Sequence, residues 1–285
     1  MGTMCSVGGG FAFYNVFQHR AVRADAIAGM GLVPHEVHPF PSIEPHLYTS
    51  LGQYEEEPSH SKLIRFGLPH AYDPIMLAGV STVTVETVSD RQRKHYFPMY
   101  SEERRGYFDL LVWNKDRDTT LYRDHKVGDD VVVRSGEVVM EYPTGQYSNV
   151  LLFIDPTGIP PAFQLLDEIR CIEDKPPNVH VMYFKPPGWS NNTPLDNRFE
   201  RMLDVYRKKA MTDAHIEYVT AGQQECVAQA LRTLPADTYV VGMLSEGAMA
   251  SLKREHLATQ AEAKREGKKM SAVRGMNKFM FLTTK

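Results

Sequence analysis

One stretch near the middle of the chain restricts the possible folds more than any other. Residues 150–154 are all apolar, which is typical of a buried β-strand, and residues 155–158 follow as a tight turn. The pattern predicts a helix directly afterwards, over residues 162–169. A strand that passes through a tight turn into a helix is the place where α/β proteins hold the phosphates of a nucleotide.

The composition of this turn is unfavourable for a phosphate. Pro156 has no backbone N–H to donate, and the charge of Asp155 repels an anion. A purely structural explanation also exists, because Gly158 permits a tight turn and Pro160 or Pro161 fits the first turn of a helix. The turn therefore predicts a strand–helix junction and leaves open whether a ligand binds there.

Strands and helices alternate through the second half of the chain. Strands are predicted at residues 150–154, 179–184, 215–219 and 238–241, and helices at residues 162–169, 197–208, 225–231 and 247–263. Such alternation indicates βαβ units and a mainly parallel sheet. The predicted strands are nearly all apolar at their centres, as expected where helices cover both faces of a sheet.

The region before residue 147 has the pattern of β-structure. Alternating or β-branched runs occur at residues 62–68, 81–88, 107–113 and 130–134, with Gly and Asp turns between them. Short strands at this spacing predict a small antiparallel barrel. The predicted fold class is thus a two-domain α+β protein, with an antiparallel β-barrel over residues 59–146 and an α/β parallel-sheet domain over residues 147–285.

Residues 1–58 are expected to form an irregular N-terminal arm, because they show little periodicity and contain many prolines. His35, His38 and His46 lie in this arm without a Cys or acid at ligand spacing, so no metal site is predicted. Three scattered cysteines argue against a disulfide framework, and the net charge of −3 gives no basic field for nucleic acid. No apolar run reaches the roughly 18 residues that indicate a transmembrane helix, so none is expected.

Short motifs occur in a recognisable order along the two predicted domains. Lys94-His95-Tyr96-Phe97-Pro98 comes first, then the turn with Thr157 and Gly158, and then Gly242 after the last predicted strand. In this order the chain resembles the ferredoxin–NADP reductase superfamily, and in particular its NADH–cytochrome b5 reductase branch. That family holds FAD on the barrel and a nicotinamide nucleotide on the second domain. The resemblance places Lys94, Tyr96, Phe97, Pro98 and Thr119 at a flavin site, and Thr157, Gly158 and Gly242 at a nucleotide site.

The same motifs depart from the family pattern wherever a cofactor should be held. Lys94 replaces an arginine and loses its bidentate fork, and Phe97 replaces a hydroxyl residue that faces the flavin. Both leading glycines of the nucleotide turn are missing, and no cysteine accompanies Gly242. Each lost charge-assisted hydrogen bond removes about 1.5–3 kcal/mol. We therefore expect vestigial sites, with no catalytic residues and neither FAD nor NAD(P)H bound.

The resemblance and the eroded motifs together favour a non-catalytic structural subunit of a larger assembly, which contacts other protein subunits through the N-terminal arm. An active FAD-dependent NAD(P)H oxidoreductase, passing electrons to a haem or another one-electron acceptor, is the alternative. A third reading is a protein that keeps a nucleotide purely as structure. The first 24 residues contain no acid, as in mitochondrial presequences, and relatives of this branch work beside respiratory membranes. The resemblance therefore favours a mitochondrial, membrane-adjacent place, with the cytoplasm as the alternative.

Overall fold

The computed structural model describes most of the two predicted domains. Described are residues 46–56, 61–68, 77, 79–88, 91, 93–101, 104–113, 120–173, 175–185, 193–219, 230, 235 and 237–265. The predictions for His35, His38 and Thr119 lie outside these residues, as does most of the helix predicted at residues 225–231.

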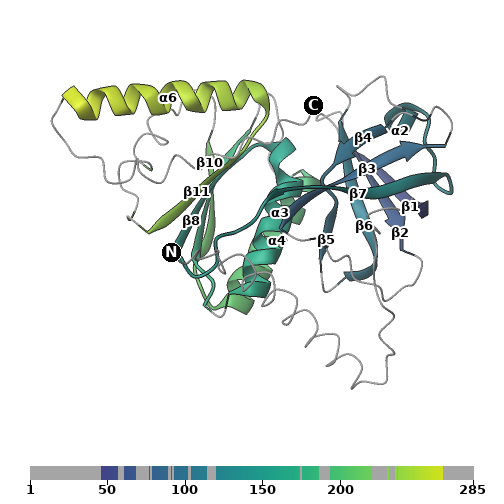
Figure 1. Cartoon of the computed structure of the whole chain (residues 1–285), viewed down its shortest axis with the longest axis horizontal. Coiled ribbons are helices and arrows are strands. Elements are labelled where there is room, and N and C mark those ends of the chain that lie inside the picture. Colours follow the sequence, from purple (N-terminus) through teal and green to yellow (C-terminus); the bar gives the residue numbers. More distant parts are fainter. Residues whose placement is uncertain are drawn as a thin grey trace, which may run out of the picture.

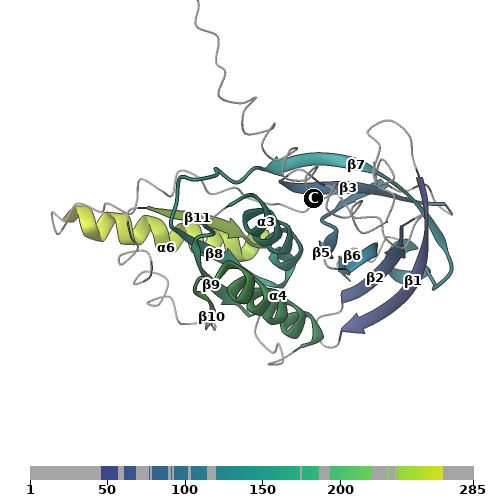
Figure 2. The ribbon, with the colours of Figure 1, turned by 90° about the horizontal axis from the view of Figure 1, so that it is seen from below.

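The first half of the described chain forms a seven-stranded antiparallel sheet, in the order β4-β3-β7-β1-β2-β6-β5. The strands are β1 (His46–Glu56), β2 (Ser61–Gly67), β3 (Val80–Thr87), β4 (Arg93–Tyr96), β5 (Met99–Ser101), β6 (Arg104–Trp113) and β7 (Asp130–Met140), with the short helix α2 (Thr120–Arg123) before β7. The sheet curls round on itself, and β4 contacts β6, so its two ends meet (Figure 2). Ile64, Phe66, Phe108 and Leu110 are fully buried inside this curl.

Strand β1 lies within the segment that was expected to be irregular. It pairs antiparallel with β2, where Tyr54 is opposite Leu63, and with β7, where Tyr48 is opposite Val131. Residues 46–56 have no sustained alternation of apolar and polar side chains, so periodicity could not indicate this strand. Main-chain pairing on both sides satisfies its backbone groups without such alternation.

The second half of the described chain forms a four-stranded parallel sheet in the order β10-β9-β8-β11, with helices on both faces (Figure 1). Its elements are β8 (Asn149–Ile154), the 3-10 turn η2 (Pro156–Gly158), α3 (Ile159–Ile172), β9 (Asn178–Phe184), α4 (Pro194–Ala210), β10 (Ala214–Val219), β11 (Thr238–Met243) and α6 (Glu246–Arg265). Helices α3 and α4 pack on one face through Leu152, Val181 and Val241. Helix α6 packs on the other face, against Phe153 and Val240.

The predicted fold class is confirmed, and the described elements of the second half match the predicted ones closely. Helix α3 begins at Ile159, before the predicted start at residue 162, because two prolines occupy its first turn. Proline is well placed there, since the first N–H groups of a helix have no partner within the helix. The very short strands β4 and β5 were not predicted, because three or four residues are too few for a period to show.

Apolar and polar contacts join the halves. Val80, Phe97 and Met99 from the barrel share one apolar core with residues of α3. The buried side chain of Gln164 on α3 adds polar contacts: its Oε1 accepts from the Ser81 N–H at 2.7 Å, and its Nε2 donates to the carbonyls of Ser81 and Pro98 at 3.0 and 2.9 Å. A continuous core with satisfied polar groups holds the halves in one orientation.

A candidate nucleotide site at the carboxyl edge of the parallel sheet

The candidate site lies where β8 and β11 end side by side. These strands are parallel and paired, with Met243 opposite Ile154, so the turn after β8 and the turn after β11 lie next to each other. The N–H of Asp155 donates to the carbonyl of Met243 at 3.4 Å. In open α/β sheets ligands bind at this carboxyl edge, so these two turns are the place to look for a nucleotide.

Asp155 binds the backbone of both turns through its carboxylate. One oxygen accepts from the Thr157 N–H at 2.9 Å, from the Thr157 hydroxyl at 2.5 Å and from the Gly158 N–H at 3.3 Å. The other oxygen accepts from the N–H of Ser245, after β11, at 2.8 Å. Asp155 is only 5% exposed. It is therefore the N-cap of η2 and also a bridge between two turns that are 90 positions apart in the sequence.

The position of Asp155 decides what the turn can bind. A phosphate at a strand–helix turn is held by free backbone N–H groups that point at it. Here the N–H groups of Thr157, Gly158 and Ser245 already donate to the Asp155 carboxylate. The carboxylate thus occupies the place of an anion, and its negative charge repels a second one. The residues of this turn do not fit the pyrophosphate of a dinucleotide.

Gly158 is required for the close approach of the two turns. A Cβ built on Gly158 would lie 1.8 Å from the carbonyl oxygen of Met243, which is backbone and cannot swing away. The φ angle of Gly158 is −85°, which any residue can adopt, so only the lack of space excludes a side chain. Gly158 therefore has a structural reason to be present that involves no ligand.

We expect Gly158→Ala to destabilise the protein by about 3 kcal/mol, at the upper end of the usual cost of overpacking a core. The reason is that β11 and η2 must separate to admit the methyl group. The measurement is urea unfolding followed by circular dichroism.

Gly247→Ala is the matched control for this change. Nothing lies within 4 Å of a Cβ at Gly247, which is in the first turn of α6. Alanine is favoured over glycine in a helix, so we expect this variant to be unchanged or more stable by up to about 1 kcal/mol. Equal stability of the two variants would show that the turns do not meet as described.

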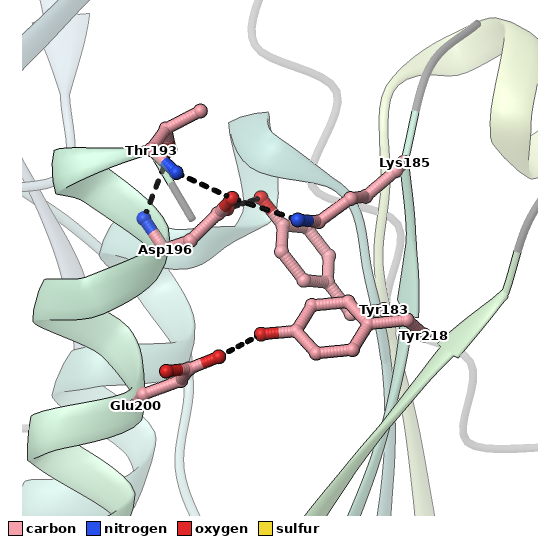
Figure 3. A network of polar contacts seen from close by, with 6 residues as sticks. All are labelled: Tyr183, Lys185, Thr193, Asp196, Glu200 and Tyr218. Atoms are coloured by element: carbon pink, nitrogen blue, oxygen red, sulfur yellow. Dashed lines mark hydrogen bonds and ion pairs between the residues drawn. The ribbon is translucent and has the colours of Figure 1, made fainter. Parts of the chain in front are cut away.

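A second polar cluster lies at the same edge, where β9 ends (Figure 3). Lys185 lies at the end of β9, and its Nζ donates to Asp196 of α4 at 2.9 Å; the lysine side chain is 6% exposed and the aspartate is fully buried. Thr193 and Asp196 also cap α4 reciprocally, each side chain accepting from the other's backbone N–H. Lys185, the cation of this cluster, is thus already paired within the protein.

Two tyrosines complete this cluster. The Tyr183 hydroxyl donates to Asp196 at 2.6 Å, and the Tyr218 hydroxyl donates to Glu200. Burial is the main reason that the pKa of each tyrosine is raised above its usual value, and the neighbouring carboxylates raise it further. Lys185 also lies over the ring of Tyr218, 4.5 Å from its centre. Both phenols stay protonated at neutral pH and act as donors that fix α4 to the sheet.

Two of the residues predicted for the flavin site, Tyr96 and Phe97, lie in two different apolar cores. Tyr96 is 8% exposed and belongs to the core inside the barrel, whereas Phe97 belongs to the core shared with α3. The Pro98 carbonyl accepts from Gln164. Lys94 is half-buried on β4. The structure thus brings Phe97 and Pro98 against α3, and Thr119, the predicted partner for the FAD pyrophosphate, lies outside the described residues.

The predicted nucleotide residues are brought together in part. Gly158 meets the end of β11 at the Met243 carbonyl, whereas Thr157 donates to Asp155; Gly242 lies within β11, buried and opposite Phe153. Sequence reasoning missed Ser245, Lys185 and Asp196. For Asp196 a signal existed, because Thr193 three residues before an acid, with a proline between them, is a capping-box pattern. For Ser245 and Lys185 no local pattern indicates the partner.

Two further findings concern the described residues alone. Among them, no group of His, Cys, Asp and Glu side chains has a geometry that would hold a metal ion. Within the same part of the chain, no helix is both long and apolar enough to cross a membrane.

Sequence comparison finds reductases among curated proteins. NADH-cytochrome b5 reductase 1 of Aspergillus oryzae is 29% identical over 131 residues, which is 44% of each chain. The protein of the same name from Scheffersomyces stipitis is 23% identical over 185 residues, or 63% of each chain, and that from Emericella nidulans is 30% identical over 127 residues, or 42% of this chain and 40% of that one. The match therefore spans less than two thirds of these relatives. No family model matches the chain.

Structural comparison finds the same kind of protein over a larger part of the chain. The cytochrome b5 reductase domain of Ulva prolifera nitrate reductase aligns with a TM-score of 0.58 at 16% identity, covering 77% of this chain and 96% of that one. A Plasmodium falciparum ferredoxin-NADP+ reductase solved with 2'P-AMP aligns with a TM-score of 0.57 at 10% identity, covering 86% and 97%. The chain thus has the two-domain fold of the ferredoxin–NADP reductases, and its sequence resembles NADH–cytochrome b5 reductases.

Proposed function

We propose that this protein is a non-catalytic structural subunit of a larger assembly, built on the fold of a cytochrome b5 reductase. The observation that carries the proposal is the position of the Asp155 carboxylate. It accepts from the N–H groups of Thr157, Gly158 and Ser245, the donors that a dinucleotide phosphate would need. A reductase without a place for its electron donor cannot turn over.

The region that resembles a flavin site supports the same proposal. A flavin needs free polar groups and an open face, but Tyr96 and Phe97 are each 8% exposed and lie within apolar cores. The carbonyl of Pro98 is already bonded to Gln164. Within the described residues, Phe97 and Pro98 serve the contact between the halves, Tyr96 packs inside the barrel, and the three offer little to a ring system.

The alternative function is that of an active FAD-dependent NAD(P)H oxidoreductase. The names of the sequence relatives favour it, since all three reported above are NADH-cytochrome b5 reductases. In that case Tyr96 and Thr119 would hold FAD, while Thr157 and Gly158 would meet the nicotinamide nucleotide. The Asp155 carboxylate would first have to leave its four hydrogen bonds, two of which are 2.8 Å or shorter.

We expect the purified full-length protein to be colourless and to release no flavin on denaturation. Titration with NADH, followed by calorimetry, should give no saturable heat, because the anion position is filled by Asp155. A yellow protein whose flavin absorption is bleached by NADH would refute the proposal. A colourless protein that releases a bound nucleotide would instead favour a purely structural nucleotide.

The place of the protein in the cell is also part of the proposal. The first 24 residues contain no acid, and relatives of this reductase branch work beside respiratory membranes, so we place the protein in mitochondria, next to a membrane. Its partners there would be other protein subunits that contact the N-terminal arm. Import of the full chain, tagged at its C-terminus, into isolated mitochondria tests the location. Size-exclusion chromatography of a mild-detergent extract tests the assembly, since the free protein would elute at its own mass of 32.3 kDa and an assembled subunit at a larger mass.

A further inference from the structure

Helix α6 carries an exposed basic face beyond Leu252. Leu252 is 3% exposed and packs on the sheet, whereas the side chains of Arg254, Lys264 and Arg265 beyond it are exposed. Leu257 is 63% exposed, although it is a large apolar residue. Figures 1 and 2 both show this end of the helix running outward past the sheet, on the side of the molecule away from the barrel.

The spacing of these residues places them together on one face of α6. In a helix with 3.6 residues per turn, Leu257, Ala261 and Lys264 recur at i, i+4 and i+7, with Arg254 and Arg265 beside them. The result is a short apolar strip, Leu257 and Ala261, with the basic residues Arg254, Lys264 and Arg265 beside it.

Such a face is unusual for this protein in two respects. The chain as a whole has a net charge of −3, whereas the charged residues named on this face are all positive. In addition, none of the described side chains between positions 253 and 265 is buried. The described side chains of this face are therefore accessible to a partner.

We propose that this face of α6, made of Arg254, Leu257, Ala261, Lys264 and Arg265, docks an acidic segment of a partner protein. The fork of each arginine pairs with carboxylates, and Leu257 offers an apolar anchor at the centre. A membrane surface fits less well, because helices that lie on membranes present a broad face of large apolar side chains. The inference rests on the proposed subunit role but not on the loss of cofactor binding.

The experiment measures binding of the full chain to a fluorescein-labelled peptide in which the heptad Glu-Leu-Ala-Glu-Glu-Leu-Glu is repeated. Fluorescence anisotropy should show saturable binding that weakens as NaCl is raised, because exposed ion pairs are screened by salt. The variant Arg254→Glu/Lys264→Glu/Arg265→Glu should bind at least tenfold more weakly. A peptide with lysine in place of glutamate should not bind to the wild type.

The matched control reverses three exposed charges elsewhere, with Arg123→Glu/Lys126→Glu/Arg207→Glu. It changes the net charge equally and should bind the acidic peptide within twofold of the wild type. The proposal is overturned if both triple variants lose binding equally, if the wild type does not bind the peptide, or if it binds only vesicles that contain phosphatidylserine. The flavin spectrum and the NADH titration are recorded on the same sample, so failure of this proposal and failure of the non-catalytic proposal are told apart.

Discussion

Replacing Asp109 by alanine should destabilise the protein by about 3 kcal/mol, because it removes the buried anion between two arginines. Asp109 on β6 is fully buried. It accepts from Nε and Nη2 of Arg65, directly opposite on β2, at 2.8 and 3.1 Å, and also from Arg198 on α4. The hydrogen bond to Asp109 is the largest reason that the pKa of Arg65 is raised.

The size of this effect follows from what happens to the arginines. The side chain of Arg65 is 36% exposed and that of Arg198 is 22% exposed, so both can turn partly toward water when Asp109 is lost. The cost therefore lies at the lower end of the roughly 3–5 kcal/mol seen when one partner of a buried pair is removed. Because Arg198 belongs to α4, the change also weakens the contact between the barrel and the α/β half.

Asp204→Ala is the control for Asp109→Ala. Asp204 pairs with Arg207 on the outside of α4, and both side chains are 52% exposed. Exposed pairs of this kind contribute about 0–1 kcal/mol, so the free energy of unfolding should hardly change. Urea unfolding of both variants measures the difference. If the two variants lose the same stability, Asp109 does not join the halves as described.

Replacing Asp155 by alanine should have two effects, a loss of about 3 kcal/mol of stability and a new affinity for anions. The stability falls because the N–H groups of Thr157, Gly158 and Ser245 lose their acceptor, and bonds to a charged group contribute about 1.5–3 kcal/mol each without adding fully. The anion affinity arises because the same donors then point into an unfilled position at the start of α3.

Thermal unfolding with and without inorganic phosphate, at equal ionic strength in chloride, measures both effects. Phosphate should raise the Tm of Asp155→Ala and leave that of the wild type unchanged, since a ligand stabilises only the form that binds it. Asp155→Asn is the intermediate case: its oxygen can still accept from Thr157, but its amide group faces the Ser245 N–H. It should lose less stability than the alanine variant and gain no phosphate response. Equal stabilisation of all three proteins by phosphate would rule out Asp155 as the group that fills the site.

The sequence predicted the regular elements well wherever burial repeats along the chain. The apolar run at residues 150–154 is confirmed as β8, and the strand patterns near residues 62–68 and 81–88 are confirmed as β2 and β3. Where one or both faces of an element are buried, apolar residues recur at a regular spacing or as a continuous run in the sequence. Strand β1 has no such period, and it is held by backbone pairing with β2 and β7. For that reason it became visible only in the structure.

In the candidate site too, some features could be predicted from local sequence and others depend on contacts between distant residues. Its place at the end of β8 could be read from the turn that follows a buried strand, and the unsuitability of Asp155 and Pro156 for a phosphate could be read from their chemistry. The sequence predicted that Asp155 would repel a phosphate, but it did not predict which group would donate a hydrogen bond to the Asp155 carboxylate. The partner is the N–H of Ser245, which the parallel pairing of β8 with β11 brings next to the turn.

Local order along the chain thus determined the two-domain architecture and the position of the candidate site. The tertiary structure decided what that site contains: a carboxylate bonded to backbone N–H groups, and a lysine already paired with Asp196. The physical reason is one of range. A strand or a helix can be predicted from residues close together in the sequence, because its buried side chains recur at a regular spacing. A hydrogen bond between residues 155 and 245 depends on how the strands between them are ordered in the sheet, and no local pattern carries that information.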